Sequence, residues 1–374
     1  MAYTAPPVRL EDIRLIEPMG KLHGSHVTPT DHTYIGHNQT SALEAHQAAV
    51  QAGRDPQPWE PTVDVMSPAD GYITDIGAFP FGSPPFGFTG ILQDYRMEIW
   101  HSCAVATIFI HLAGLPPEIR KVTGDIPSGG NWSFHGNAGN SIPVMAGQVI
   151  GQIGAHSVDY SVHDNRVVLG GFVVPDHYQG EPWKIHTVDP FAYFTEPLRS
   201  QLLAKSPRTA EPRGGRIDYD IDGRLVGNWF LEGTVDYSGG SSPGLCGNRP
   251  CPYWTGHLSI AYDHIDPGQI RISIGAGVGI GQEVCRVCES VYGVLGNSPD
   301  PAGITPQSGV VKYGLVAREH TGEYQVATKN IESRVLGTFL VEMTGQRTIK
   351  MEVVSGSRPS QVDGFSQAAK TYHR

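Results

Sequence analysis

The chain has 374 residues, enough for two domains of ordinary size. Its 27 basic and 37 acidic residues give a formal net charge of −10, which argues against a nucleic-acid partner. Only 17% of the residues are charged, whereas 46 are glycine and 29 are proline. These proportions predict a mainly β protein with many short strands and tight loops, and they exclude a helical bundle. No apolar run approaches the ~20 residues of a membrane-spanning helix, so a soluble protein is expected.

The first residues, MAYTAPP, lack the basic and apolar stretches of a secretion signal. The compartment therefore stays open: cytoplasmic for the chain as it stands, secreted or periplasmic if a leader has been removed. Nothing in the composition indicates an oligomeric state.

One helix is predicted near 41–52, where Ser41 and Glu44 form a capping box and Gly53 ends the pattern. Cys103 is expected to be a buried strand residue. Short β-branched or aromatic runs bounded by turn residues predict strands over 71–76, 95–100, 105–111 and 166–169.

Residues 199–215 are polar and contain two prolines and a glycine pair, which is typical of a linker. We therefore expect a first domain over 1–198 and a second over 216–374. Twelve of the sixteen histidines precede residue 199, so a histidine-based site is expected in the first domain.

The second domain shows an almost purely β pattern, which predicts a small β-sandwich or β-barrel. Thr344–Arg347 reads as the turn of a hairpin. The strands are predicted over 257–262, 269–274, 310–316, 336–343 and 348–354.

Two short patterns in this domain have competing interpretations. Gly227-Asn-Trp229 resembles the G-x-W signature near the first strand of lipocalin-like barrels, although a packed core tryptophan explains it equally well. His257, Asp263 and His264 lie close together in the sequence, and we interpret them as a solvated strand edge.

The remaining cysteines form two close pairs, Cys246 with Cys251 and Cys285 with Cys288. Four thiolates at these spacings suit a structural zinc site. Disulfides between two loops, or free thiols, fit the spacing equally well.

Four motifs in the first domain resemble the lysostaphin-type zinc endopeptidases. They are SPADGYI at 67–73, FIHL at 109–112, AGQVIGQIG at 146–154 and VDPFAYF at 188–194. The resemblance covers about residues 20–198 and implies a β-sheet domain of the duplicated hybrid motif class.

The same resemblance implies where a zinc site would lie, residue by residue. His26 occupies the position of the family's first zinc-binding histidine, and His111 matches its catalytic histidine. Asp159 and Ser161 stand where the family has a late H-x-H motif. A zinc ligand and a catalytic histidine are thus replaced, and an active peptidase is not expected.

The residue types still permit an altered site. His26 and His32 are six residues apart and can share one face of a strand. With Asp159 they would supply three ligands to zinc or another divalent transition metal, and His111 would act as acid or base. We therefore expect a non-catalytic module that binds a glycan, peptide or small-molecule ligand. Whether it retains a metal is open, because the same histidines also suit a relic pocket in which they only form hydrogen bonds. The alternative is a metal-dependent hydrolase that uses the same residues.

Overall fold

The computed structural model describes residues 1–38, 63–78, 94–124, 126, 134–137, 139–154, 157–239, 252–275, 291–322 and 325–374. The predicted helix at 41–52 and the two cysteine pairs lie outside these residues. Within the described part, no helix has the length and apolar character needed to cross a membrane.

The chain divides into two compact units. Unit 1 comprises Met1–Pro18, His32–Val167 and His186–Gly214, and unit 2 comprises Met19–Asp31, Val168–Ile185 and Gly215–Arg374. Two stretches that precede residue 199 therefore group with the second unit. Residues 199–214, interpreted as a linker, group with unit 1.

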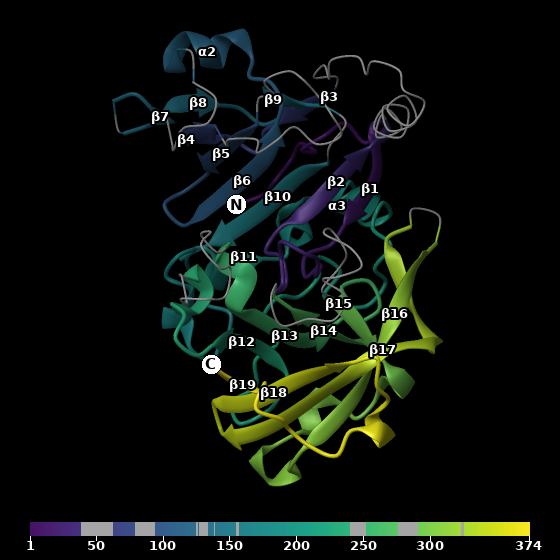
Figure 1. Ribbon diagram of the computed structural model, residues 1–374. Coiled ribbons are helices and arrows are strands. Elements are labelled where there is room, and N and C mark those ends of the chain that lie inside the picture. Colours follow the sequence, from purple (N-terminus) through teal and green to yellow (C-terminus); the bar gives the residue numbers. More distant parts are fainter. Residues whose placement is uncertain are drawn as a thin grey trace, which may run out of the picture. The chain divides into compact units, whose positions relative to one another are not determined.

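Unit 1 is built on a nine-stranded antiparallel sheet in the order β1-β2-β10-β6-β5-β4-β7, with β11 beside β10 and β8 beside β4 (Figure 1). Its strands are β1 (Ile13–Glu17), β2 (Thr33–His37), β4 (Gly71–Ala78), β5 (Tyr95–Trp100), β6 (Val105–Leu112), β7 (Phe134–His135), β8 (Ile142–Val144), β10 (Val158–Asp164) and β11 (Thr187–Val188). A separate two-stranded sheet and two short helices complete it: β3 (Val63–Met66), β9 (Val149–Ile153), α2 (Pro117–Thr123) and α3 (Leu198–Leu203).

Two sequence predictions in unit 1 are wrong. Residues 166–169 form no strand, because the Asp164 carboxylate accepts the backbone N–H of Arg166 at 3.0 Å and turns the chain where β10 ends. Cys103 is exposed rather than buried. It lies in the turn between β5 and β6, where the Ser102 hydroxyl accepts the N–H groups of Ala104 and Val105.

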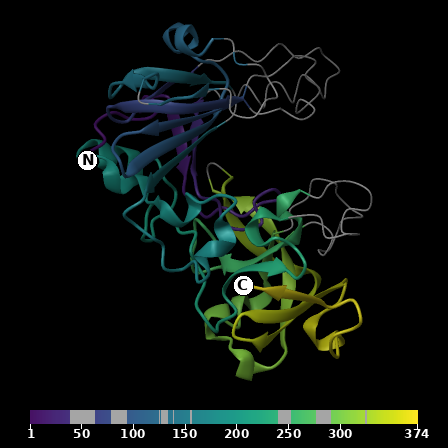
Figure 2. The same ribbon diagram turned by 90° about the vertical axis from the view of Figure 1, so that its left-hand side faces the viewer.

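Unit 2 contains a closed barrel in which eight strands follow one another in chain order (Figures 1 and 2). Every neighbouring pair is antiparallel, and the last strand pairs with the first. The strands are β12 (Gly227–Leu231), β13 (His257–Tyr262), β14 (Ile270–Ile274), β15 (Val291–Val294), β16 (Val311–Thr321), β17 (Ala327–Gly345), β18 (Thr348–Ser355) and β19 (Lys370–His373). The five strands predicted here are confirmed, and of the two predicted architectures the barrel is present.

Short 3-10 helices join these elements in both units. They are Pro175–Tyr178, Lys184–His186, Pro190–Tyr193, Asp236–Ser238, Tyr253–Gly256, Leu295–Asn297, Pro301–Gly303, Pro306–Ser308 and Pro359–Gln361.

The strand alternation of β12 places Trp229 in the main hydrophobic core of the barrel and Phe230 in a neighbouring cluster. Trp229 is fully buried, its indole N–H donates to the carbonyl of Leu225 at 2.8 Å, and the Arg374 guanidinium lies 4.0 Å from its ring centroid. Trp229 is therefore a central packing residue of the barrel.

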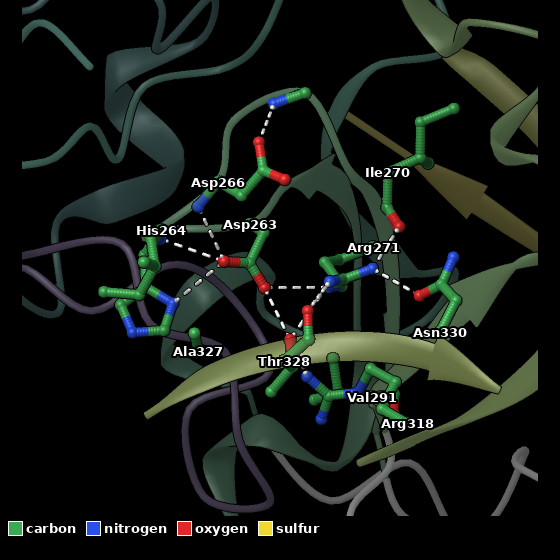
Figure 3. Close-up of polar contacts among 12 residues, drawn as sticks. Asp263, His264, Asp266, Ile270, Arg271, Val291, Arg318, Ala327, Thr328 and Asn330 are labelled. Carbon is green, nitrogen blue, oxygen red and sulfur yellow. Dashed lines mark hydrogen bonds and ion pairs between the residues drawn. The ribbon is translucent and has the colours of Figure 1, made fainter. Parts of the chain in front are cut away.

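The interpretation of Asp263 as part of a solvated strand edge is wrong. Asp263 and Arg271 are almost completely buried and form an ion pair at 2.9 Å (Figure 3). The guanidinium also donates to Asn330 at 2.8 Å and to the hydroxyl and carbonyl of Thr328. His257 and His264 are buried as well. This pair connects β14 to the start of β17, because each strand contributes polar groups to the same network.

Candidate functional site

The strands β5 and β10 of unit 1 each have one apolar and one polar face because their side chains alternate. The residues of β5 and β10 that enter the core are Tyr95, Met97, Ile99, Val158, Tyr160 and Val162. Those between them are Arg96, Glu98, Trp100, Asp159, Ser161 and His163. The chemistry-bearing side chains of these strands therefore share one face.

Strand register brings four of the polar residues into contact. Asp159 of β10 lies opposite Tyr34 of β2 and Ile110 of β6, close in sequence to His32 and His111 respectively. Tyr95, which follows Asp94, lies opposite Leu112. We call Asp94, His111, Asp159 and His32 the histidine–carboxylate cluster.

Both histidines of the cluster approach the same carboxylate oxygen. His32 Nε2 lies 3.3 Å and His111 Nε2 lies 3.4 Å from Asp159 Oδ2. The other ring nitrogen of His111, Nδ1, hydrogen-bonds Asp94 Oδ2 at 2.9 Å. The side chain of His111 is 36% exposed, whereas both carboxylates are 6% exposed. The cluster thus presents one imidazole, backed by two buried carboxylates, toward solvent.

His111 has a strained backbone and a shifted pKa. Its φ of 72° is left-handed, a conformation that a non-glycine residue adopts only at a cost in energy. Burial opposes charge on the ring, but the carboxylates of Asp159 and Asp94 outweigh it and raise the pKa of His111 to about 9. The imidazole is therefore positively charged at neutral pH and donates from both nitrogens.

Each carboxylate of the cluster also has one oxygen without a hydrogen-bond donor among the described residues. Asp94 Oδ1 and Asp159 Oδ1 are buried and accept no hydrogen bond from any residue that the structure describes. A buried charged acceptor without a donor costs about 1–3 kcal/mol or more.

The three metal ligands expected from the sequence fall in different units. His26 belongs to unit 2, where its ring packs edge-on against His23 at 4.6 Å, whereas His32 and Asp159 belong to unit 1. Asp31, the carboxylate nearest to His26 in sequence, instead pairs with the buried Lys184 at 3.4 Å. Across the described ranges, no group of three or more His, Cys, Asp or Glu side chains is arranged to hold a metal ion. A zinc site formed by His26, His32 and Asp159 stays a prediction.

Ser161, at the second position of the replaced H-x-H motif, forms a separate pair. Its hydroxyl lies 2.8 Å from His163 Nε2, and His163 Nδ1 lies 3.3 Å from the hydroxyl of Thr187. Ser161 and His163 are 5% and 3% exposed. This pair therefore joins β10 to β11 rather than presenting a nucleophile to a substrate.

Asp94 is the one member of the cluster that sequence reasoning missed. A signal was present, because Asp94, Arg96, Glu98 and Trp100 alternate with apolar residues and extend the polar face of β5 by one position.

In comparisons with known proteins, no family model matches this chain and no curated protein matches it.

Proposed function

We propose that unit 1 is a non-catalytic ligand-binding module whose site is the histidine–carboxylate cluster. The observation that carries the proposal is the half-exposed imidazole of His111, which Asp94 and Asp159 hold at the surface of unit 1. A ligand with oxygen acceptor groups would contact this ring. Glycans, peptides and small polar molecules all offer such groups.

The positive charge of His111 favours a role in ligand binding over a role as a general base. With a pKa of about 9, only about one ring in a hundred is neutral at pH 7. A general base must be unprotonated to accept a proton. A charged, half-exposed imidazole instead attracts a ligand oxygen.

The architecture of each unit is compatible with the family that its motifs resemble. A β-sheet domain that carries His111 near the end of a central strand is in keeping with a divergent lysostaphin-type domain. A closed eight-stranded barrel with a buried Trp229 on its first strand supports a lipocalin-like description of unit 2.

Isothermal titration calorimetry of the full chain tests the proposal, with capped dipeptides that differ in their side chains as probes. At least one of them is expected to bind with or without a chelator. Asp159→Asn and Asp94→Asn are each expected to weaken binding about tenfold or more, because hydrogen bonds to charged groups contribute about 1.5–3 kcal/mol.

Asp75→Asn is the matched control. Asp75 pairs with His135 at 2.7 Å on the same sheet, but the pair is exposed and lies outside the cluster. Binding that survives both cluster variants would overturn the proposal. So would a bound equivalent of zinc or another divalent metal that is lost in His32→Ala, which would support the metal-dependent hydrolase instead.

A further inference from the structure

An open hollow of about 500 Å³ lies on unit 1 away from the histidine–carboxylate cluster. It is lined by residues 70–72, where β4 begins, and 100–103, where β5 ends. Asp94 precedes the other end of β5, so six strand residues separate the two places. This volume falls within the usual range for ligand pockets, about 300–1,000 Å³.

Two aromatic rings form the apolar part of the hollow. Tyr72 and Trp100 are directly opposite each other on β4 and β5, so their side chains lie side by side on one face of the sheet. Tyr72 is 57% exposed, so its ring is accessible to a ligand.

The indole and the neighbouring imidazole are held in place before any ligand binds. The indole N–H of Trp100 donates to Glu98 Oε1 at 2.7 Å. His101 is fixed through both ring nitrogens, by the carbonyl of Asp70 at 2.9 Å and the hydroxyl of Thr107 at 2.9 Å. A preorganised site loses little side-chain entropy on binding.

The polar rim identifies the chemistry of the occupant. The acidic residue Asp70 borders the hollow, and its Oδ1 already accepts the backbone N–H of Ala146 at 2.9 Å. Burial lowers the pKa of His101, so its imidazole is neutral at neutral pH and adds no positive charge. The lining therefore disfavours anions. A purely apolar occupant would desolvate the second oxygen of Asp70 without supplying a donor. A ring with one face of C–H groups and a rim of hydroxyls satisfies both parts of the hollow.

We propose that this hollow is a binding site for a neutral saccharide, which stacks on Tyr72 and Trp100 and donates a hydroxyl to Asp70. The site uses none of the residues of the histidine–carboxylate cluster, so it does not depend on the function proposed for that cluster.

Titration of the full chain with neutral hexasaccharides tests this proposal. The probes are cellohexaose, maltohexaose, mannohexaose and hexa-N-acetylchitohexaose, and their binding is measured by calorimetry and tryptophan fluorescence. At least one is expected to bind saturably and change the fluorescence. Tyr72→Ala is expected to weaken that binding about tenfold or more, whereas Tyr72→Phe retains the stacking face and is expected to stay within about threefold of the unaltered chain.

Controls separate this proposal from the previous one. Tyr72 is exposed, so Tyr72→Ala is expected to leave the unfolding transition nearly unchanged. His111→Gln is expected to retain saccharide binding, which supports a separate site. Absence of binding by all four probes would overturn the proposal. Equal binding by Tyr72→Ala and the unaltered chain, or loss of binding in His111→Gln alone, would also overturn it.

Discussion

Replacing Asp263 by alanine is expected to lower the free energy of unfolding by about 3–5 kcal/mol. The Arg271 guanidinium is 1% exposed, and the variant would leave this charge buried without its carboxylate partner. Thr328 would lose a hydrogen bond to the same carboxylate as well. Urea unfolding followed by circular dichroism measures the effect.

The exposed pair Asp222–Arg347 is the matched control. Its two atoms are also 2.9 Å apart, but the side chains are 49% and 47% exposed. Asp222→Ala is therefore expected to change stability by less than about 1 kcal/mol. Equal effects of Asp222→Ala and Asp263→Ala would contradict the structural role assigned to the buried pair.

The stabilisation by the Asp263–Arg271 pair depends on pH. Burial would raise the pKa of Asp263, but the side chains of His264 and Arg271 and hydrogen bonds from Asp266 and Thr328 lower it to about 2. An unfolded aspartate titrates near pH ~3.9. The stabilisation, roughly 2 kcal/mol, is thus complete above about pH 5 and lost as the pH falls toward 2. The stability gap between the unaltered chain and Asp263→Ala is expected to narrow over that interval.

Replacing Trp229 by alanine is expected to cost about 3–5 kcal/mol, through lost burial and the cavity left behind. The indole is fully buried in the barrel core, and its loss would also remove the ring under the Arg374 guanidinium. Trp229→Phe keeps an aromatic ring and is expected to cost less than Trp229→Ala. Thermal unfolding of the two variants measures the difference, and a cost below about 1 kcal/mol for Trp229→Ala would contradict this packing.

Five of the eight barrel strands were predictable from their β-branched and alternating residues, whereas β12, β15 and β19 were not predicted. The predicted strand 257–262 coincides with β13, and the predicted turn Thr344–Arg347 joins β17 to β18. Alternation does not distinguish a barrel from a sandwich. That distinction depends on the pairing of β19 with β12, between residues more than a hundred positions apart.

The candidate site was predictable in part. His32, Asp159 and His111 were singled out in the sequence, and the structure places them in contact. Asp94 was missed because it precedes its strand by one residue. His26 was grouped with them from even spacing, which assumes one continuous strand. The chain instead forms a tight turn, where His23 and His26 exchange backbone hydrogen bonds in unit 2.

The same limitation explains the error at Asp263. Three polar residues near the end of a strand usually indicate solvent, and no local pattern reveals that Arg271 and Thr328 converge on this carboxylate. Thr328 is 65 positions away in the sequence. Buried ion pairs of this kind depend on tertiary contacts rather than on local composition.

The most direct test of the proposed site is the protonation state of His111 in the full chain. Long-range ¹H–¹⁵N correlation NMR, with the ring signals assigned from His111→Gln, reports both ring nitrogens across a pH titration. The cluster geometry predicts an imidazole protonated at both nitrogens up to about pH 9, with a lower pKa in Asp94→Asn. A ring that is neutral at pH 7, or a nitrogen with the chemical shift of a metal ligand, would contradict a charged donor held between two carboxylates.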